Sequence, residues 1–131
     1  MGFLKRLFGR GDVPPFVLPT EGATTDSGLL HEVVEEGDGP APGPFETVTV
    51  HYAGWLTDGT LFDSSYARGK PISFPLNRVI AGWGEGLQLM KTGGTSRFVI
   101  PPELGYGSRG APPAIGPNAT LVFQVELIEI R

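Results

Sequence analysis

The sequence has no cysteine, only two histidines and no long apolar run. The absence of cysteine excludes disulfides, zinc–thiolate sites and a thiol nucleophile, so nothing in the chain requires an oxidising compartment. The basic residues near the start are followed by no apolar stretch of about seven residues for a secretory signal, and no span of about eighteen residues suits a membrane helix. We therefore expect a soluble, cytoplasmic protein without stable membrane insertion.

Basic side chains are scarce in most of the chain. Lys5, Arg6 and Arg10 are the only basic residues before residue 12, so residues 12–131 hold seven basic and fourteen acidic side chains, a net charge of −7. A nucleic acid is densely negative and is bound by basic surfaces, so we expect no nucleic-acid partner.

The length of 131 residues is that of one ordinary domain. Residues 12–26 are rich in proline and small polar residues, a composition typical of linkers. We predict a flexible N-terminal tail and linker over residues 1–26 and one monomeric domain over residues 27–131. Residues 3–8 place apolar and basic side chains on opposite sides of a two-turn helix, but so short a helix is marginal alone, and we favour a frayed tail.

A two-residue alternation of apolar and polar side chains predicts the strands. The segments expected to form strands are 29–36, 47–52, 94–100 and 121–127. After Leu127 the apolar phase shifts, which indicates a bulge late in the last strand. The dipeptide Asp58-Gly59 between apolar pairs predicts a hairpin with a type I′ turn.

One helix is expected inside the domain, where apolar residues recur at spacings of three, four and three. These residues are Ile80, Trp83, Leu87 and Met90. Three glycines in the same segment each cost about 1 kcal/mol relative to alanine, so the helix must be held by packing on a sheet. A short helix across a curved antiparallel sheet is an α+β domain.

Residues 101–119 form a long segment rich in proline and glycine between two strands. Segments of this length in compact domains are usually functional or disordered, and the apolar Leu104, Tyr106 and Ile115 favour an ordered flap. Residues 105–110 match the dinucleotide pattern G-x-G-x-x-G, but Pro112 and Pro113 follow and no helix can begin there to hold phosphate. We expect no cofactor.

The histidines also lack the partners that catalysis requires. His31 and His51 belong to no metal-ligand or triad motif, so we expect no metal site and no hydrolytic centre. Aromatic residues stand instead at the turning points of the chain, with Asp63 directly after Phe62. An apolar pocket with a few aimed hydroxyl and carboxylate groups is typical of a site for a small ligand or a peptide.

Five ordered motifs resemble one known family, the FK506-binding type of peptidyl-prolyl cis–trans isomerase. The motifs are Val50-His51-Tyr52-Ala53-Gly54, Asp58-Gly59-Thr60-Leu61-Phe62-Asp63-Ser64-Ser65, Val79-Ile80-Ala81-Gly82-Trp83, Pro102-Glu103-Leu104-Gly105-Tyr106-Gly107 and Asn118-Ala119-Thr120-Leu121-Val122-Phe123. The resemblance covers residues 27–131 and is strongest to the bacterial branch related to macrophage infectivity potentiators.

The resemblance implies a twisted antiparallel sheet of five or six strands half-wrapped around one short α-helix. It implies that Trp83 forms the floor of a pocket and that Asp63 faces the rotating amide, held by Tyr52. Tyr106 and the backbone N–H of Ile80 would donate hydrogen bonds to substrate carbonyls. The catalytic residues implied in this way are Asp63, Tyr106, Tyr52, Phe62 and Trp83, and the substrate-binding residues are Phe74, Val79, Ile80, Ile115 and Phe123.

The same resemblance implies proline-containing polypeptides as substrates and macrolides of the FK506 and rapamycin type as ligands. Ile72, Ala111, Ala114 and Gly116 at the rim depart from the best-studied eukaryotic members, which bears on substrate preference and macrolide affinity. The alternative is a proline-peptide binding module or a holdase chaperone with little turnover, since the same walls would bind peptide in either case.

Overall fold

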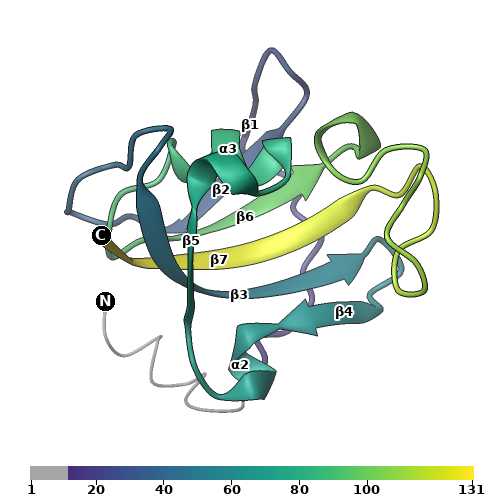
Figure 1. Cartoon of the computed structure of the whole chain (residues 1–131), viewed down its shortest axis with the longest axis horizontal. Helices are drawn as coiled ribbons and strands as arrows, with labels where there is room; N and C mark the ends of the chain where they lie inside the picture. Colours follow the sequence, from purple (N-terminus) through teal and green to yellow (C-terminus); the bar gives the residue numbers. More distant parts are fainter. Residues whose placement is uncertain (1–11) are drawn as a thin grey trace.

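The computed structural model describes residues 12–131 as a curved antiparallel sheet with its main helix on the concave side (Figure 1). The segment expected to be amphipathic, residues 3–8, lies outside the described residues. The strands are β1 (Ala23–Thr24), β2 (Leu30–Glu35), β3 (Thr47–Leu56), β4 (Leu61–Ser64), β5 (Ile72–Pro75), β6 (Thr95–Ile100) and β7 (Leu121–Ile130). The α+β prediction is confirmed.

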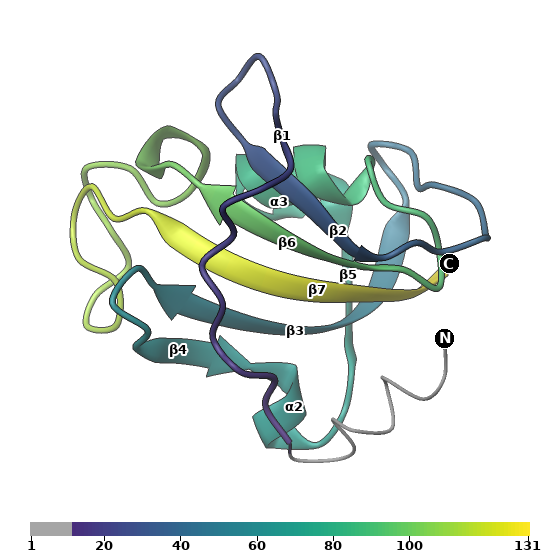
Figure 2. The ribbon, with the colours of Figure 1, turned by 180° about the vertical axis from the view of Figure 1, so that it is seen from behind.

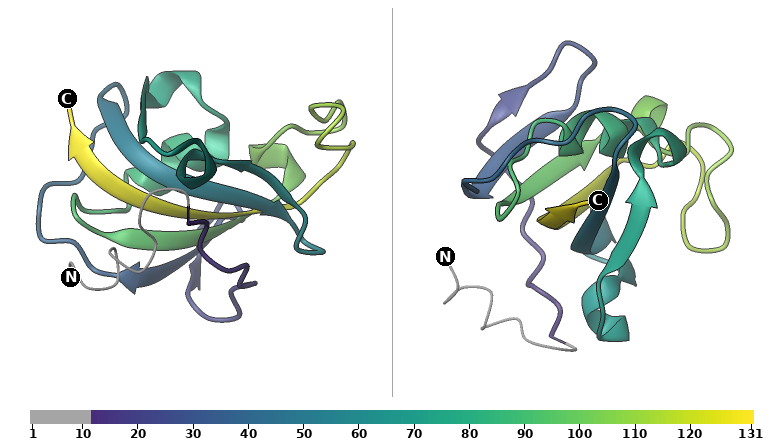
Figure 3. Two further views of the ribbon diagram at one scale, coloured as in Figure 1. Left: turned by 90° about the horizontal axis from the view of Figure 1, so that it is seen from below. Right: turned by 60° about the vertical axis from the view of Figure 1, so that its left-hand side comes forward.

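The order of strands across the sheet is β1-β2-β6-β7-β3-β4, and β5 pairs with β3 beside β4. The sheet therefore has seven strands, where five or six were expected. The added strands β1 and β5 are two and four residues long, too short to show an alternating pattern in the sequence. The turned views show how strongly β3 and β7 twist as they cross the molecule (Figure 3).

The predicted bulge in the last strand is confirmed. Val50 of β3 is in register with Leu127 of β7, and Thr49 is in register with Glu129, so Ile128 is an extra residue on β7. An unpaired residue of this kind increases local twist, which helps the sheet to curve around the helix.

The predicted hairpin at Asp58-Gly59 is also confirmed, but the type I′ turn is wrong. Leu56 and Thr60 close a three-residue loop, with the N–H of Leu56 donating to the carbonyl of Thr60 at 2.9 Å. Gly59 has a φ of +92°, but Asp58 has no positive φ, which a type I′ turn would require. In the described chain, Asn118 is the one non-glycine residue with positive φ. The extra loop residue removes the need for Asp58 to adopt a left-handed conformation.

The helix α3 (Ala81–Leu87) packs across the concave face, as predicted, and ends before Met90. A Cβ atom on Gly82 would lie 2.7 Å from the Ile100 side chain, and one on Gly86 would lie 2.7 Å from the Phe98 ring. The glycines therefore let the helix backbone approach β6 closely, and tertiary packing offsets their low helix propensity.

Three further helical turns accompany α3: α2 (Ser65–Arg68), η1 (Leu76–Arg78) and η2 (Pro102–Leu104). No periodic pattern in the sequence predicted α2, although the residues that cap it can be recognised. The hydroxyl of Ser64 accepts from the Ala67 N–H at 3.2 Å, and Gly69 ends the turn with a φ of +79°. In the described chain, no helix has the length and apolarity to cross a membrane.

Residues 12–22 run across the convex face of the sheet, as the view from behind shows (Figure 2). Pro14 is fully buried there, and Phe16 packs edge-to-face on Trp55 with ring centroids 5.7 Å apart. This segment covers a small apolar cluster composed of Ala53, Trp55, Tyr66 and Val122. The composition of residues 12–26 indicates a linker, yet here the segment contributes packing. The domain boundary at residue 27 stays a prediction.

Candidate active site

A cavity of about 480 Å³ opens on the concave side of the sheet, between the β3–β4 hairpin, β5, α3 and the flap. Its walls are Tyr52, Phe62, Asp63, Phe74, Arg78, Val79, Ile80, Trp83, Tyr106 and Phe123. The fold thus brings nine of the ten residues named from the sequence to one cavity. Their roles in binding or catalysis stay predictions.

Trp83 stands at the centre of the aromatic walls. The ring centroid of Trp83 lies 5.1 Å from Tyr52, 5.2 Å from Phe74 and 5.3 Å from Phe123. The rings meet edge-to-face, an arrangement that places the positive edge of one ring against the negative face of the other. Trp83 is 6% exposed and Phe123 is 4% exposed, so both are held by the core while part of each lines the cavity.

The start of α3 places one backbone donor beside these rings. The carbonyl of Ile80 accepts from the N–H groups of Trp83 and Gly84 at 3.0 and 3.1 Å. The N–H of Ile80 itself donates to no residue in the described part of the chain. Because a helix leaves its first N–H groups without partners inside the helix, this donor is available to a ligand carbonyl.

Asp63 is held at the cavity wall by two side chains. The hydroxyl of Tyr52 donates a short hydrogen bond to Oδ2, and Nη1 of Arg68 donates to Oδ1 at 2.5 Å. Nη2 of Arg68 also donates to the Tyr52 hydroxyl at 3.1 Å. The contact between Tyr52 and Asp63 was expected, whereas Arg68 was missed. Its position at the end of the unpredicted turn α2 explains the omission.

The charges of this network follow from its contacts. Burial acts to raise the pKa of Asp63, but the hydrogen bonds from Tyr52 and Arg68 outweigh it and lower the pKa of the carboxyl. Burial, and next the hydrogen bond to Asp63, raise the pKa of the Tyr52 hydroxyl. Asp63 is therefore an ionised group with both oxygens engaged. It supplies a fixed field and is unsuited to abstract a proton.

Tyr106 reaches the cavity from an ordered flap. The flap is closed by paired hydrogen bonds between Ala111 and Ile115, and the N–H of Gly107 donates to the Pro102 carbonyl at 2.9 Å. The Tyr106 side chain is 40% exposed, and its hydroxyl bonds to nothing within residues 12–131. This hydroxyl is free to donate to a ligand at the rim.

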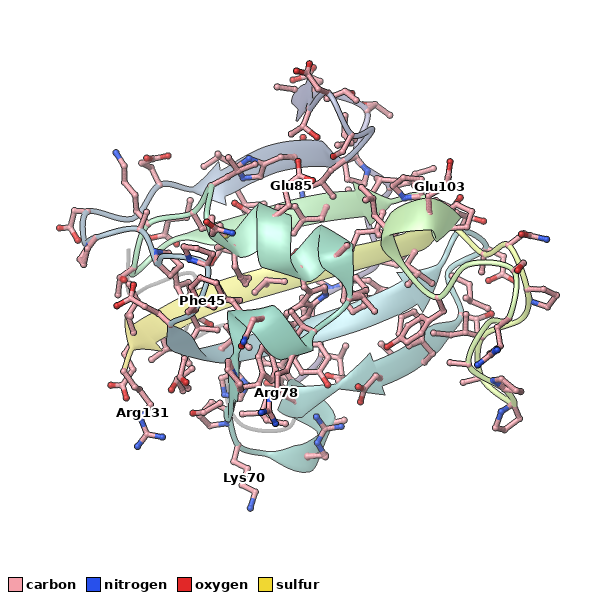
Figure 4. The ribbon with its side chains drawn as sticks, turned by 45° about the horizontal axis from the view of Figure 1, so that its top comes forward. Phe45, Lys70, Arg78, Glu85, Glu103 and Arg131 are labelled. Carbon is pink, nitrogen blue, oxygen red and sulfur yellow. The ribbon has the colours of Figure 1, made fainter. Side chains whose placement is uncertain are left out.

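Ile115, the tenth residue named from the sequence, is not among the residues that line the cavity, and its role in substrate binding stays a prediction. It is 4% exposed and belongs to the main core at the base of the flap. Arg78, which no sequence pattern singled out, takes a place in the wall instead, at the end of η1 (Figure 4). The one sequence feature that could have indicated a place for Arg78 in the wall is its position directly before Val79-Ile80.

His51 and Ser65, a histidine beside a hydroxyl group, do not line this cavity. Nδ1 of His51 lies 2.8 Å from Oγ of Ser65, but Ser65 is fully buried and its hydroxyl also accepts from the Tyr52 N–H. A nucleophile without access to substrate cannot support hydrolysis. Residues 12–131 contain no group of three metal-ligating side chains.

The comparisons with known proteins agree with this geometry. The family model "FKBP-type peptidyl-prolyl cis-trans isomerase" matches residues 39–128. The chain is 54% identical over 108 residues to the isomerase FkpA of Escherichia coli, covering 82% of this chain and 40% of FkpA. It is 48% identical to the isomerase Mip of Coxiella burnetii, covering 82% of this chain and 47% of Mip.

Solved structures support the same assignment. The crystal structure of FkpA from Escherichia coli superposes with a TM-score of 0.82 at 51% identity, covering 86% of this chain and 53% of that one. A peptidyl-prolyl cis-trans isomerase from Pseudomonas syringae superposes with a TM-score of 0.76 at 42% identity, covering 80% of this chain and 77% of that one. The chain spans about half or less of FkpA and Mip. The matched domain shows that the chain belongs to the FKBP-type peptidyl-prolyl cis-trans isomerase family.

Proposed function

We propose that this chain accelerates the cis–trans rotation of X–Pro bonds in polypeptides. The observation that carries the proposal is the open cavity whose floor and walls are Trp83, Tyr52, Phe74 and Phe123. The ring of a proline residue is apolar and compact, and such a cavity removes it from water together with the bond that precedes it.

The barrier to this rotation comes from amide resonance and is about 18 to 20 kcal/mol. Resonance is lost at the twisted transition state, which is therefore less dipolar than either planar isomer. Moving the amide from water into an aromatic cavity costs free energy, and this cost is smaller for the twisted form because it is less dipolar. The apolar walls therefore favour the twisted amide. Each 1.36 kcal/mol of this difference is about a tenfold gain in rate.

The polar groups at the cavity orient the peptide in this proposal. The Tyr106 hydroxyl and the Ile80 N–H donate to carbonyls on either side of the bond that rotates. Asp63, held by Tyr52 and Arg68, presents a fixed negative charge to the amide as its charge distribution changes. No step transfers a proton or forms a covalent bond, and no cofactor takes part.

We propose proline-containing polypeptides as the partners of the cavity and macrolides of the FK506 and rapamycin type as further ligands. Both present a ring and neighbouring carbonyls to the same apolar walls. A monomeric state and a cytoplasmic location, both expected from the sequence, remain predictions that sedimentation and cell fractionation can test.

The test is the refolding of a protein whose slow phase is a trans-to-cis prolyl step, followed with catalytic amounts of the chain. We expect wild type to accelerate this phase and Trp83→Phe, which keeps a ring but shortens the floor, to be slower. Asp63→Asn keeps a side chain of the same shape without the charge and should lower the rate with little loss of stability. A chain that binds the peptide without accelerating refolding would instead be the binding module or holdase.

A further inference from the structure

A second cavity, of about 440 Å³, lies between the tip of the β3–β4 hairpin and the end of the flap. Its lining residues are Leu56, Thr57, Asp58, Gly116, Asn118, Ala119 and Thr120. We propose that this cavity is a substrate subsite that binds the residues flanking the proline of an extended polypeptide and prefers a basic side chain. The proposal rests on the function proposed above.

The two cavities share both of their walls. One wall is the hairpin, where Phe62 and Asp63 of β4 line the aromatic cavity and Leu56 at the end of β3 lines the second one. The other wall is the flap. Tyr106 lines the aromatic cavity, while the carbonyl of the next residue, Gly107, accepts from the N–H of Asn118 in the second cavity at 2.9 Å.

Residues of both cavities also pack on one core. Leu56 and Ala119 of the second cavity pack against the same core cluster as Phe62 and Val79 of the aromatic cavity. In the proposal, a chain that leaves the aromatic cavity between the hairpin and the flap continues into the second cavity. The residues three or four positions from the proline, about 10 to 13 Å along an extended strand, are the ones to reach it.

The side chains that line the second cavity suit a polypeptide backbone that carries a cationic side chain. Thr57, Asn118 and Thr120 offer hydroxyl and amide groups to a peptide backbone. Asp58 is the single charged residue of the lining. Hydrogen bonds from the backbone N–H and side chain of Thr60 lower the pKa of its carboxyl, so it is ionised at neutral pH. This charge attracts lysine or arginine and repels glutamate.

The backbone around the cavity is fixed before any ligand arrives. Oδ1 of Asp58 accepts from the Thr60 N–H at 2.9 Å, which holds the carboxylate on the hairpin turn. Asn118 has a φ of +57°, a left-handed conformation that asparagine tolerates, and its N–H is bound to the flap. A preformed cavity loses less entropy when it binds a peptide than a mobile one does.

The experiment compares kcat/KM for a proline tetrapeptide with kcat/KM for nonapeptides that carry lysine, glutamine or glutamate three or four residues from the proline, on either side. We expect lysine to exceed glutamate by about two- to fivefold in one register, the range of an exposed ion pair, and the ratio to shrink at high salt. Equal values for lysine and glutamate at every position in wild type would overturn the subsite.

Two variants locate the effect. Asp58→Asn removes the charge but keeps an oxygen that can accept from Thr60, and it should abolish the preference for lysine. Asn118→Gly keeps the left-handed backbone without the amide and should weaken only the nonapeptides. Glu129→Gln is the matched control, because it removes the same charge beside Arg131, at the end of β7 far from the flap (Figure 4).

The tetrapeptide separates the two proposals. It is too short to reach the second cavity, so its rate should be the same in wild type, Asp58→Asn and the control. No activity of wild type on the tetrapeptide would refute the isomerase proposal itself. Activity on the tetrapeptide with a lysine preference that survives Asp58→Asn would overturn the subsite alone.

Discussion

Replacing Gly54 by alanine should damage the core and the aromatic cavity together. Gly54 lies on β3, in register with Asp63 on one side and with Phe123 on the other. A Cβ atom at this position would lie 2.6 Å from Cε1 of Phe123 and 2.8 Å from Cζ of Phe62. Carbon atoms pack at about 3.5 to 4.0 Å, so the methyl group fits only if at least one of the two rings moves.

The magnitude follows from two opposing effects. Inserting a methyl group into a packed core costs about 1 to 3 kcal/mol. Alanine also reduces the freedom of the unfolded chain, which stabilises the fold by about 0.4 to 1 kcal/mol. We expect a net loss of about 1 to 2 kcal/mol in the free energy of unfolding. If about 1.4 kcal/mol of transition-state stabilisation is lost as Phe62 or Phe123 moves, kcat/KM falls about tenfold.

Urea unfolding and an isomerase assay on one set of variants test this reasoning. Gly43→Ala is the control, because the nearest atom to its added Cβ is 3.7 Å away: its activity should be unchanged, and its stability should stay the same or rise by up to about 1 kcal/mol. Gly54→Ala combined with Phe62→Leu should lose less stability than the sum of the two single changes, since the shorter side chain makes room for the methyl group. A Gly54→Ala variant as stable and active as wild type would refute the argument.

Three further predictions concern other parts of the molecule. Tyr106→Phe should weaken peptide binding by about 0.5 to 1.5 kcal/mol, the usual value of one hydrogen bond, and titration calorimetry showing equal affinity would contradict a hydroxyl contact. Phe16→Ala should lower the free energy of unfolding by about 1 to 2 kcal/mol through the lost packing on Trp55, while isomerase activity is retained; unchanged urea curves would mean that the Phe16 ring adds no stability. Burial lowers the pKa of His51 and of His31, so below about pH 6.5 the unfolded state binds protons that the folded state does not, and stability should fall as the pH is lowered through that range. The test compares urea midpoints between pH 7.5 and 5.5 in wild type and in a double variant with both histidines changed to glutamine. An equally steep fall in the double variant would mean that other groups cause the pH dependence.

Patterns that repeat along the chain predicted the fold well. Alternation in β3 and β7 predicted the face of each strand that packs on the main core, although residues 121–125 of β7 are buried on both faces. The phase shift after Leu127 predicted the bulge at Ile128. The spacing of Ile80, Trp83 and Leu87 predicted α3 because packing on the sheet requires one apolar face.

Features that depend on few residues were harder to predict. The strands β1 and β5 and the turn α2 are too short to show a periodic pattern, so the sequence did not predict them or the role of Arg68. Pro14 and Phe16 lie in a segment whose composition indicates a linker, since composition does not show that an apolar cluster on the convex face remains to be covered.

The sequence by itself determined the longer strands of the sheet, the glycine-rich helix and, through the family resemblance, nine of the ten residues that line the aromatic cavity. The tertiary structure decided which groups meet: Arg68 on Asp63, Arg78 in the cavity wall, Ile115 in the core, and a second cavity bounded by a hairpin and a flap. The physical reason is the separation along the chain of the residues that each feature involves. Periodicity records how each segment meets the core, whereas contacts between segments depend on the curvature of the sheet and on where each turn ends.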